Sequence, residues 1–153
     1  MEKGIVHLKY IIFSLFILMY SSVLLAEEIE PFTTDGCSSF PDGTIEQQSL
    51  WTHCCVQHDL AYWKGGTYQQ RLEADEALSS CVYKVGEKEI AELMLAGVRV
   101  GGTPYLPTSF RWGYGWPFPK VYKALTENEK QKVEEKLNQF ERMIQTMIKS
   151  IRN

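Results

Sequence analysis

Several chemically capable side chains lie within two turns of one expected helix, in the run CCVQHD at residues 54–59. At 100° per residue, five side chains fall on one arc of this helix: Cys54, Cys55, His58, Asp59 and Tyr62. An imidazole can act as a general base, a carboxylate can bind a hard cation, and cysteines can form covalent links. Packing alone does not account for this combination, so we infer a reactive face.

A second carboxylate can reach the imidazole if two expected helices are antiparallel. Asp75 lies six residues before Cys81, and Cys54 lies four residues before His58. If Cys54 bonds to Cys81, His58 and Asp75 lie about 6 Å and about 9 Å along their helices from the bridge. They can then meet, with Tyr62 one turn further on and placed to hydrogen-bond the same carboxylate. A histidine that an aspartate holds in one tautomer is a general base.

Four helices are expected to position these residues, over about residues 48–63, 68–85 and 87–99 and from Thr126 onward. Ser49 or Thr52 is the expected cap of the first helix. Thr67 is expected to cap the second, and Thr126 with Glu129 forms a capping box for the last. The expected apolar positions of the middle helices are Ala74, Leu78, Cys81, Val82 and Val85, then Ile90, Leu93, Met94 and Val98.

Two further segments have more than one interpretation. Residues 100–119 hold six aromatic side chains among glycines and prolines, which predicts an ordered loop, with a short hairpin as an option. These aromatic residues fit a lid over the core, which we favour for most of them, or an interfacial lipid surface. The last helix has an apolar seam that fits packing or self-association better than a membrane surface: Val133, Leu137, Phe140, Ile144, Met147 and Ile151.

The N-terminal segment resembles a secretory signal. Lys3 and Lys9 precede an apolar run over residues 10–26, with cleavage expected after Ala26. Residues 27–153 then form one secreted or periplasmic domain, and an uncleaved membrane anchor is the alternative. Loss of Glu2, Lys3 and Lys9 changes the net charge from −3 to −4, and no basic run indicates a nucleic-acid partner.

The four cysteines can pair in three ways. Cys54 and Cys55 point about 100° apart on a helix, so each should bond a different element. Export permits disulfides. Zinc is the weaker alternative, because the chain has no C-x-x-C pair.

The sequence CCVQHDLAY resembles the active-site helix of the secreted phospholipase A2 superfamily, with its C-C-x-x-H-D pattern and an aromatic residue four positions after the histidine. Asp75 and Cys81 resemble that family's second catalytic helix, and TDGCSS resembles its calcium loop. The resemblance covers residues 33–85 and leaves residues 86–153 as a helical extension without a counterpart. Only 16 residues separate His58 from Asp75, which favours the compact bacterial and fungal type.

The resemblance implies a mainly α fold in which a calcium loop precedes two antiparallel, disulfide-linked helices. The aromatic-rich loop and the C-terminal helix, which are expected from the sequence alone, follow this part. It implies that His58 activates water to attack the sn-2 ester of a phospholipid at a membrane surface, with Asp75 and Tyr62 supporting the imidazole. The implied Ca²⁺ ligands are Asp59, the Asp35 side chain and the Gly36 carbonyl. The implied disulfides are Cys37–Cys55 and Cys54–Cys81.

Two other functions stay open. The residues after Cys37 are Ser38, Ser39, Phe40 and Pro41, whereas the animal enzymes have a glycine-rich loop here. A catalytically silent module that binds lipid or protein is therefore the first alternative, and a membrane-anchored interaction protein is the second. Asp42 is a weaker candidate ligand, and His53 faces nearly opposite the reactive arc.

Overall fold

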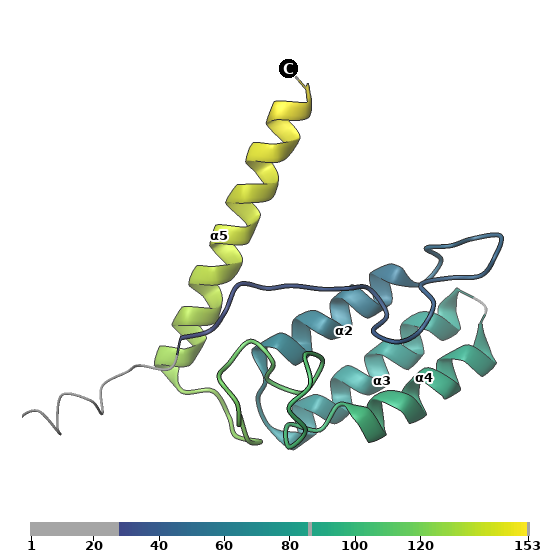
Figure 1. Cartoon of the computed structure of the whole chain (residues 1–153), viewed down its shortest axis with the longest axis horizontal. Coiled ribbons are helices and arrows are strands. Elements are labelled where there is room, and N and C mark those ends of the chain that lie inside the picture. The colour runs from purple at the N-terminus through teal and green to yellow at the C-terminus, as the bar shows by residue number, and fades with distance from the viewer. Residues whose placement is uncertain (1–27, 86, 153) are drawn as a thin grey trace, which may run out of the picture.

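The computed structural model describes residues 28–85 and 87–152, which form four helices and, within those ranges, no strand (Figure 1). The helices are α2 (Thr52–Lys64), α3 (Tyr68–Lys84), α4 (Lys88–Gly101) and α5 (Glu127–Arg152). Helices α2, α3 and α4 lie side by side, and α5 projects from one end of this body. The expected mainly helical fold with two disulfides is confirmed.

The expected signal segment lies outside the described residues. Among the helices of the described ranges, none has the length and apolar character needed to cross a membrane. Two disulfides indicate that the protein folds in an oxidising compartment, because cytosolic reductants keep thiols reduced.

Local capping explains where two of the helices begin. The Thr67 hydroxyl accepts a hydrogen bond from the Gln70 amide, and the Gln70 side chain accepts one from the Thr67 amide. Thr126 and Glu129 form the same reciprocal pair before α5. Both predicted caps are therefore present, and each satisfies two backbone donors that a helix start leaves free.

The predicted cap of α2 is wrong. Neither Ser49 nor Thr52 caps this helix, which starts after Trp51 without a side-chain cap. Trp51 is instead held by the preceding loop: its amide donates to the Asp42 carbonyl at 3.0 Å and its indole donates to the Pro41 carbonyl at 2.6 Å. Contacts with the loop therefore replace the local cap, and residues 48–51 remain in turns.

The core consists of two apolar clusters. The first lies between α2, α3 and α4 and contains Trp51, Leu78, Val82, Ala91, Met94 and the four cysteines, of which Cys81 is only partly buried. The second contains Ile29, Trp63, Trp116 and Val133 and joins four segments that are distant in the sequence. Leu93, predicted as an apolar core position, is instead 57 % exposed and lines a pocket.

The aromatic segment closes the C-terminal end of α2. The buried indoles of Trp112 and Trp116 donate to the carbonyls of Gly66 at 3.0 Å and Lys64 at 2.8 Å. The optional hairpin is wrong, because residues 102–119 form turns without strand pairing. Of the six aromatic side chains, Trp112 and Trp116 are buried, whereas Tyr105, Phe110 and Phe118 are exposed. The expectation that most of them belong to the core is therefore wrong.

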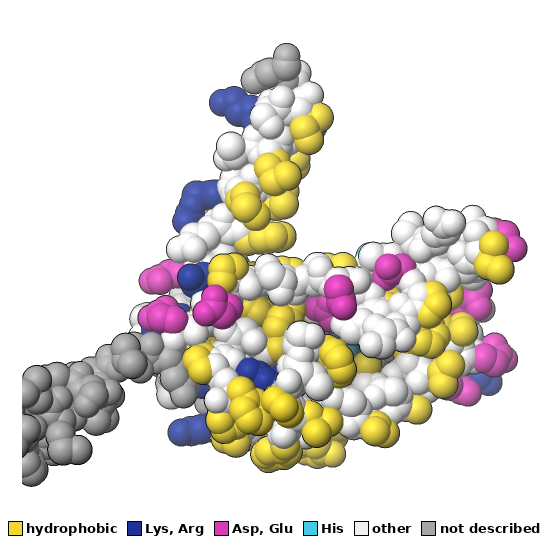
Figure 2. Space-filling view, viewed as in Figure 1, with side chains coloured by type: hydrophobic (Ala, Val, Ile, Leu, Met, Phe, Trp, Pro, Cys, Tyr) yellow, Lys and Arg dark blue, Asp and Glu magenta, His cyan; other side chains and the backbone are white. Residues whose placement is uncertain are grey.

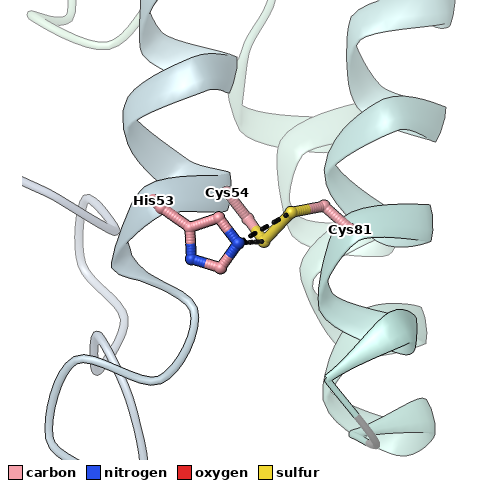
Figure 3. A group of neighbouring side chains, drawn as sticks. All are labelled: His53, Cys54 and Cys81. Atoms are coloured by element: carbon pink, nitrogen blue, oxygen red, sulfur yellow. Dashed lines mark hydrogen bonds between the residues drawn. A yellow bond between two sulfur atoms is a disulfide. The ribbon is translucent and has the colours of Figure 1, made fainter.

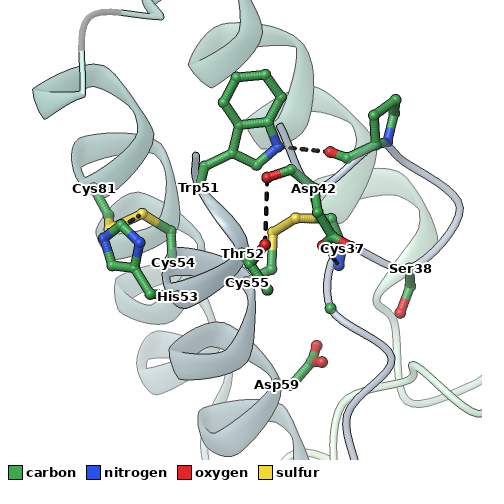
Figure 4. The surroundings of a disulfide bond; sticks show 12 residues. Cys37, Ser38, Asp42, Trp51, Thr52, His53, Cys54, Cys55, Asp59 and Cys81 are labelled. Carbon is green, nitrogen blue, oxygen red and sulfur yellow. Dashed lines mark hydrogen bonds between the residues drawn. A yellow bond between two sulfur atoms is a disulfide. The ribbon is translucent and has the colours of Figure 1, made fainter. Parts of the chain in front are cut away.

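Two disulfides fix the chain around α2. Cys54 on α2 bonds to Cys81 on α3, and Cys37 in the preceding loop bonds to Cys55 (Figure 4). This is the pairing that the family resemblance implies. The adjacent cysteines of α2 therefore hold two different segments, one on each side of the helix.

Replacing both Cys54 and Cys81 by alanine should lower the free energy of unfolding by about 3–4 kcal/mol, because the bridge closes a 27-residue separation in the unfolded chain. Urea denaturation followed by circular dichroism measures the loss. Peptide mapping of the unreduced protein should link Cys54 with Cys81. A peptide that links Cys54 with Cys37 would contradict this structure.

Candidate active site

His58 and Asp75 meet at the contact between α2 and α3. The His58 Nε2 atom lies 3.1 Å from Asp75 Oδ1, and both side chains are buried. The Tyr62 hydroxyl donates to the same carboxylate oxygen at 2.6 Å. The three-residue connection between the helices makes them antiparallel, which brings residues 58 and 75 together. The pairing leaves Nδ1 of His58 available to another partner.

Tyr62 is held as a hydrogen-bond donor. Burial and the neighbouring Asp75 carboxylate raise the pKa of Tyr62 far above its usual value, so the hydroxyl keeps its proton. The ring packs against His58 with a centroid separation of 4.1 Å. The backbone of Gly102 approaches the ring so closely that a Cβ atom there would collide with the hydroxyl. A side chain at position 102 would therefore displace Tyr62.

Two arginines face the other oxygen of Asp75. Arg99 Nε lies 3.0 Å and Arg71 Nε lies 3.9 Å from Oδ2. The Arg99 contact is an ion pair rather than an aligned hydrogen bond, because neither Oδ2 nor Nε meets hydrogen-bond geometry. Arg71 also donates from Nε to the Tyr62 hydroxyl at 3.0 Å. The charge of the buried carboxylate is thereby balanced from two helices.

Neither arginine was expected at this site from the sequence. Arg71 lies four residues before Asp75, so helical spacing alone places the two on one face of α3. Arg71 is 4 % exposed and reaches α4, where its Nη2 atom donates to the carbonyls of both Val98 and Arg99. Arg99 lies on a different helix, and no local pattern in the sequence connects it with Asp75.

The His58–Asp75 pair lies beside a pocket of about 350 Å³. His58, Asp59 and Tyr62 form its polar wall. The remaining wall is mostly apolar or backbone and includes Leu78, Leu93, Met94, Gly97, Val98, Phe110 and residues 36–40. A pocket with this division suits a ligand that has both an apolar part and a polar group.

Asp59 lines the same pocket and is nearly buried. Burial is the main cause that raises the pKa of Asp59 to about 6, and the charges of Asp35 and Asp42 add to the rise. Two neighbours oppose it: His58, and the Thr34 hydroxyl, which donates to Oδ2 at 2.7 Å. A bound cation would offset this cost of ionising Asp59.

The loop of residues 34–42 supplies further oxygen atoms. Gly36 lines the pocket, whereas the exposed Asp35 accepts a hydrogen bond from the Ser38 hydroxyl at 2.7 Å. Asp42 has a structural contact: its Oδ1 accepts from the Cys37 amide at 2.8 Å. Gly36 has φ +77°, and a Cβ atom there would collide with the Asp42 carboxylate. Carboxylate and carbonyl oxygens of this kind are the ligand atoms that hard cations prefer.

A second group of side chains has ligand atoms close enough together to hold a softer metal. In the described ranges, the ligand atoms of His53, Cys54 and Cys81 lie within 4.8 Å of one another (Figure 3). The His53 Nε2 atom is 3.4 Å from Cys54 Sγ and 3.5 Å from Cys81 Sγ. Because the two sulfurs are bonded to each other, neither is a thiolate, and only the His53 imidazole of this group can act as a metal ligand while the bridge is closed.

Comparison with protein-family models, curated proteins and solved structures finds no match for this chain. The fold class does not assign a function, because one fold supports many chemistries. A functional proposal must therefore come from the contacts, burial and pocket of this site.

Replacing Asp59 by asparagine should stabilise the cation-free protein at pH 8. The folded-state pKa is about 6 against 3.8 for an unburied carboxyl, so the free energy of unfolding falls as pH rises between these values. The full shift corresponds to about 3 kcal/mol, and solvent in the pocket reduces the expected gain to about 1–2 kcal/mol. Urea denaturation in chelator at pH 4 and pH 8 measures this gain in the free energy of unfolding. An equal effect at both pH values would contradict the raised pKa of Asp59.

Replacing Arg99 by glutamine should destabilise the protein by about 1–3 kcal/mol, because the buried Asp75 carboxylate loses its nearest cation. In an Asp75→Asn background the same change should cost much less. A double-mutant cycle measured by urea denaturation gives the coupling. The exposed Arg152→Gln is the matched control, and additive effects of the Arg99 and Asp75 changes would show that the two residues are not paired.

Proposed function

We propose that this chain is an exported, calcium-dependent hydrolase that cleaves the sn-2 ester of phospholipids. The products are a free fatty acid and a lysophospholipid. The observation that carries the proposal is the His58–Asp75–Tyr62 contact on the polar wall of an otherwise apolar pocket. The resemblance of residues 33–85 to secreted phospholipase A2 supports it, as do the two disulfides in that family's pairing.

In the proposed reaction, His58 is the general base. With its Nε2–H donated to Asp75, its Nδ1 lone pair takes a proton from a water molecule, whose oxygen bonds to the ester carbonyl carbon. Asp75 stabilises the resulting imidazolium, and Tyr62 fixes the orientation of the carboxylate. The tetrahedral intermediate then expels the glycerol oxygen, which receives the proton from His58.

The proposed calcium ligands are the carboxylates of Asp59 and Asp35 and the carbonyl of Gly36. When bound, Ca²⁺ would polarise the ester carbonyl and compensate the negative charge of the phosphate. Asp59 supports this assignment most strongly, because it is nearly buried beside His58 and its pKa is raised by that burial.

A module that binds lipid without turnover is the second candidate, and one observation favours it. Both proposed ligand carboxylates already accept hydrogen bonds within the chain: Thr34 donates to Asp59, and Ser38 donates to Asp35. A pocket with satisfied carboxylates can bind an apolar ligand without a cation.

The proposed function is tested by the release of fatty acid from phospholipid vesicles that carry a labelled sn-2 acyl chain. His58→Gln should reduce release by about a thousandfold, because the general base is lost. His53→Gln is the matched control, since this exposed histidine on the same helix does not line the pocket and should keep full activity.

The calcium assignment is tested in the same assay. A chelator should abolish release by the wild-type protein, and Asp59→Asn should abolish the response to added calcium. Hydrolysis that persists in chelator would contradict the calcium ligands. Vesicle binding with no release by any form of the protein would support the binding module instead.

A further inference from the structure

Only the first part of α5 packs on the body. Val133 is buried with Ile29, Trp63 and Trp116, and Leu137 packs partly against the same cluster. Phe140 makes an edge-to-face contact with Phe32, with ring centroids 5.8 Å apart. The C-terminal part of α5 projects away from the body (Figure 1). The apolar seam that anchors α5 therefore continues past its last aromatic contact.

The projecting part has a broad apolar face. Met143, Met147 and Ile151 are 52 %, 52 % and 80 % exposed, and Ile148 is 38 % exposed. At 100° per residue, the apolar side chains from 140 to 151 occupy an arc of about 140°. Figure 2 shows these side chains along one side of α5 and basic side chains along the other.

Charge is divided along the same helix. Residues 142–152 contain Arg142, Lys149 and Arg152 and no acidic residue, a net charge of +3. Residues 127–141 contain five glutamates and three lysines, a net charge of −2. The projecting end is thus positive in a chain whose net charge is −3.

These features fit a second copy of the chain poorly. A two-stranded coiled coil buries a narrow seam and has charged residues beside it that form ion pairs between helices. Here Met143 and Ile148 occupy the flanking positions, so pairing would leave apolar surface exposed and provide no such ion pairs. All three charges of the projecting end also have the same sign.

An anionic lipid surface fits both features. A broad apolar face can enter the boundary between head groups and acyl chains, as in interfacial amphipathic helices. Basic residues on the far side lie within one helix diameter of the surface, about 10 Å, which is close to the screening length at physiological salt. They therefore still attract anionic head groups.

We propose that residues 140–152 of α5 dock the protein on a surface of anionic phospholipid. The proposal deepens the proposed function, because it names the element that brings such a hydrolase to a bilayer. It concerns binding alone, so it can be tested where no lipid is cleaved.

The test measures sedimentation of full-length protein with vesicles, in the His58→Gln background and in chelator. Vesicles of phosphatidylcholine are compared with equimolar mixtures of phosphatidylcholine and phosphatidylglycerol. Met147→Glu with Ile151→Glu should weaken binding to the mixed vesicles by about a hundredfold, because two exposed apolar anchors are lost. Gln145→Glu with Thr146→Glu adds the same charge outside the apolar arc and is the matched control, with a loss of no more than about threefold.

Equal loss in both double variants would overturn the apolar face as the docking element. Equal affinity for vesicles with and without phosphatidylglycerol would overturn the role of charge. The face would instead belong to a second copy if the wild-type protein does not bind vesicles and sediments as a dimer that the Met147 and Ile151 changes dissociate. If the wild-type protein hydrolyses a dispersed short-chain phospholipid but does not bind vesicles, only the docking proposal is contradicted. If it binds vesicles but hydrolyses no phospholipid, only the proposed activity is contradicted.

Discussion

The fully buried carboxylate of Asp75 is the constraint on which the arrangement of the body depends. An ionised group without solvent is costly unless charge and hydrogen bonds compensate it. Its partners come from three helices: His58 and Tyr62 from α2, Arg71 from its own helix, and Arg99 from α4. Helix α4 therefore helps to balance the charge of Asp75, although it carries none of the residues proposed to react.

Sequence spacing predicted the contacts that depend on helical periodicity. His58, Tyr62 and Asp75 were expected to meet because one bridge and one antiparallel turn determine their positions. The capping residues Thr67 and Thr126 were predictable for the same reason, since capping is decided within four residues. These parts of the fold are local in the chain or covalently linked.

The remaining contacts connect positions that no local pattern relates. Arg99 reaches Asp75 from another helix, and Trp51 is held by the Asp42 carbonyl in place of a helix cap. Leu93 follows the periodicity of a core residue, yet it lines the pocket because α4 turns that side toward open space. Periodicity identifies a face of a helix, but tertiary packing decides what covers that face.

The second apolar cluster also sets the order in which the chain can be completed. Ile29, Trp63, Trp116 and Val133 span more than a hundred positions, and the Glu30 amide donates to the carbonyl of Gly115. Such non-local pairings form late, because their loop entropy is lost before the contacts can compensate it. This end of the body is complete only when the segments from Ile29 to Val133 are all present. Packing at this end of the body therefore depends on a residue that is synthesised more than a hundred positions after Ile29.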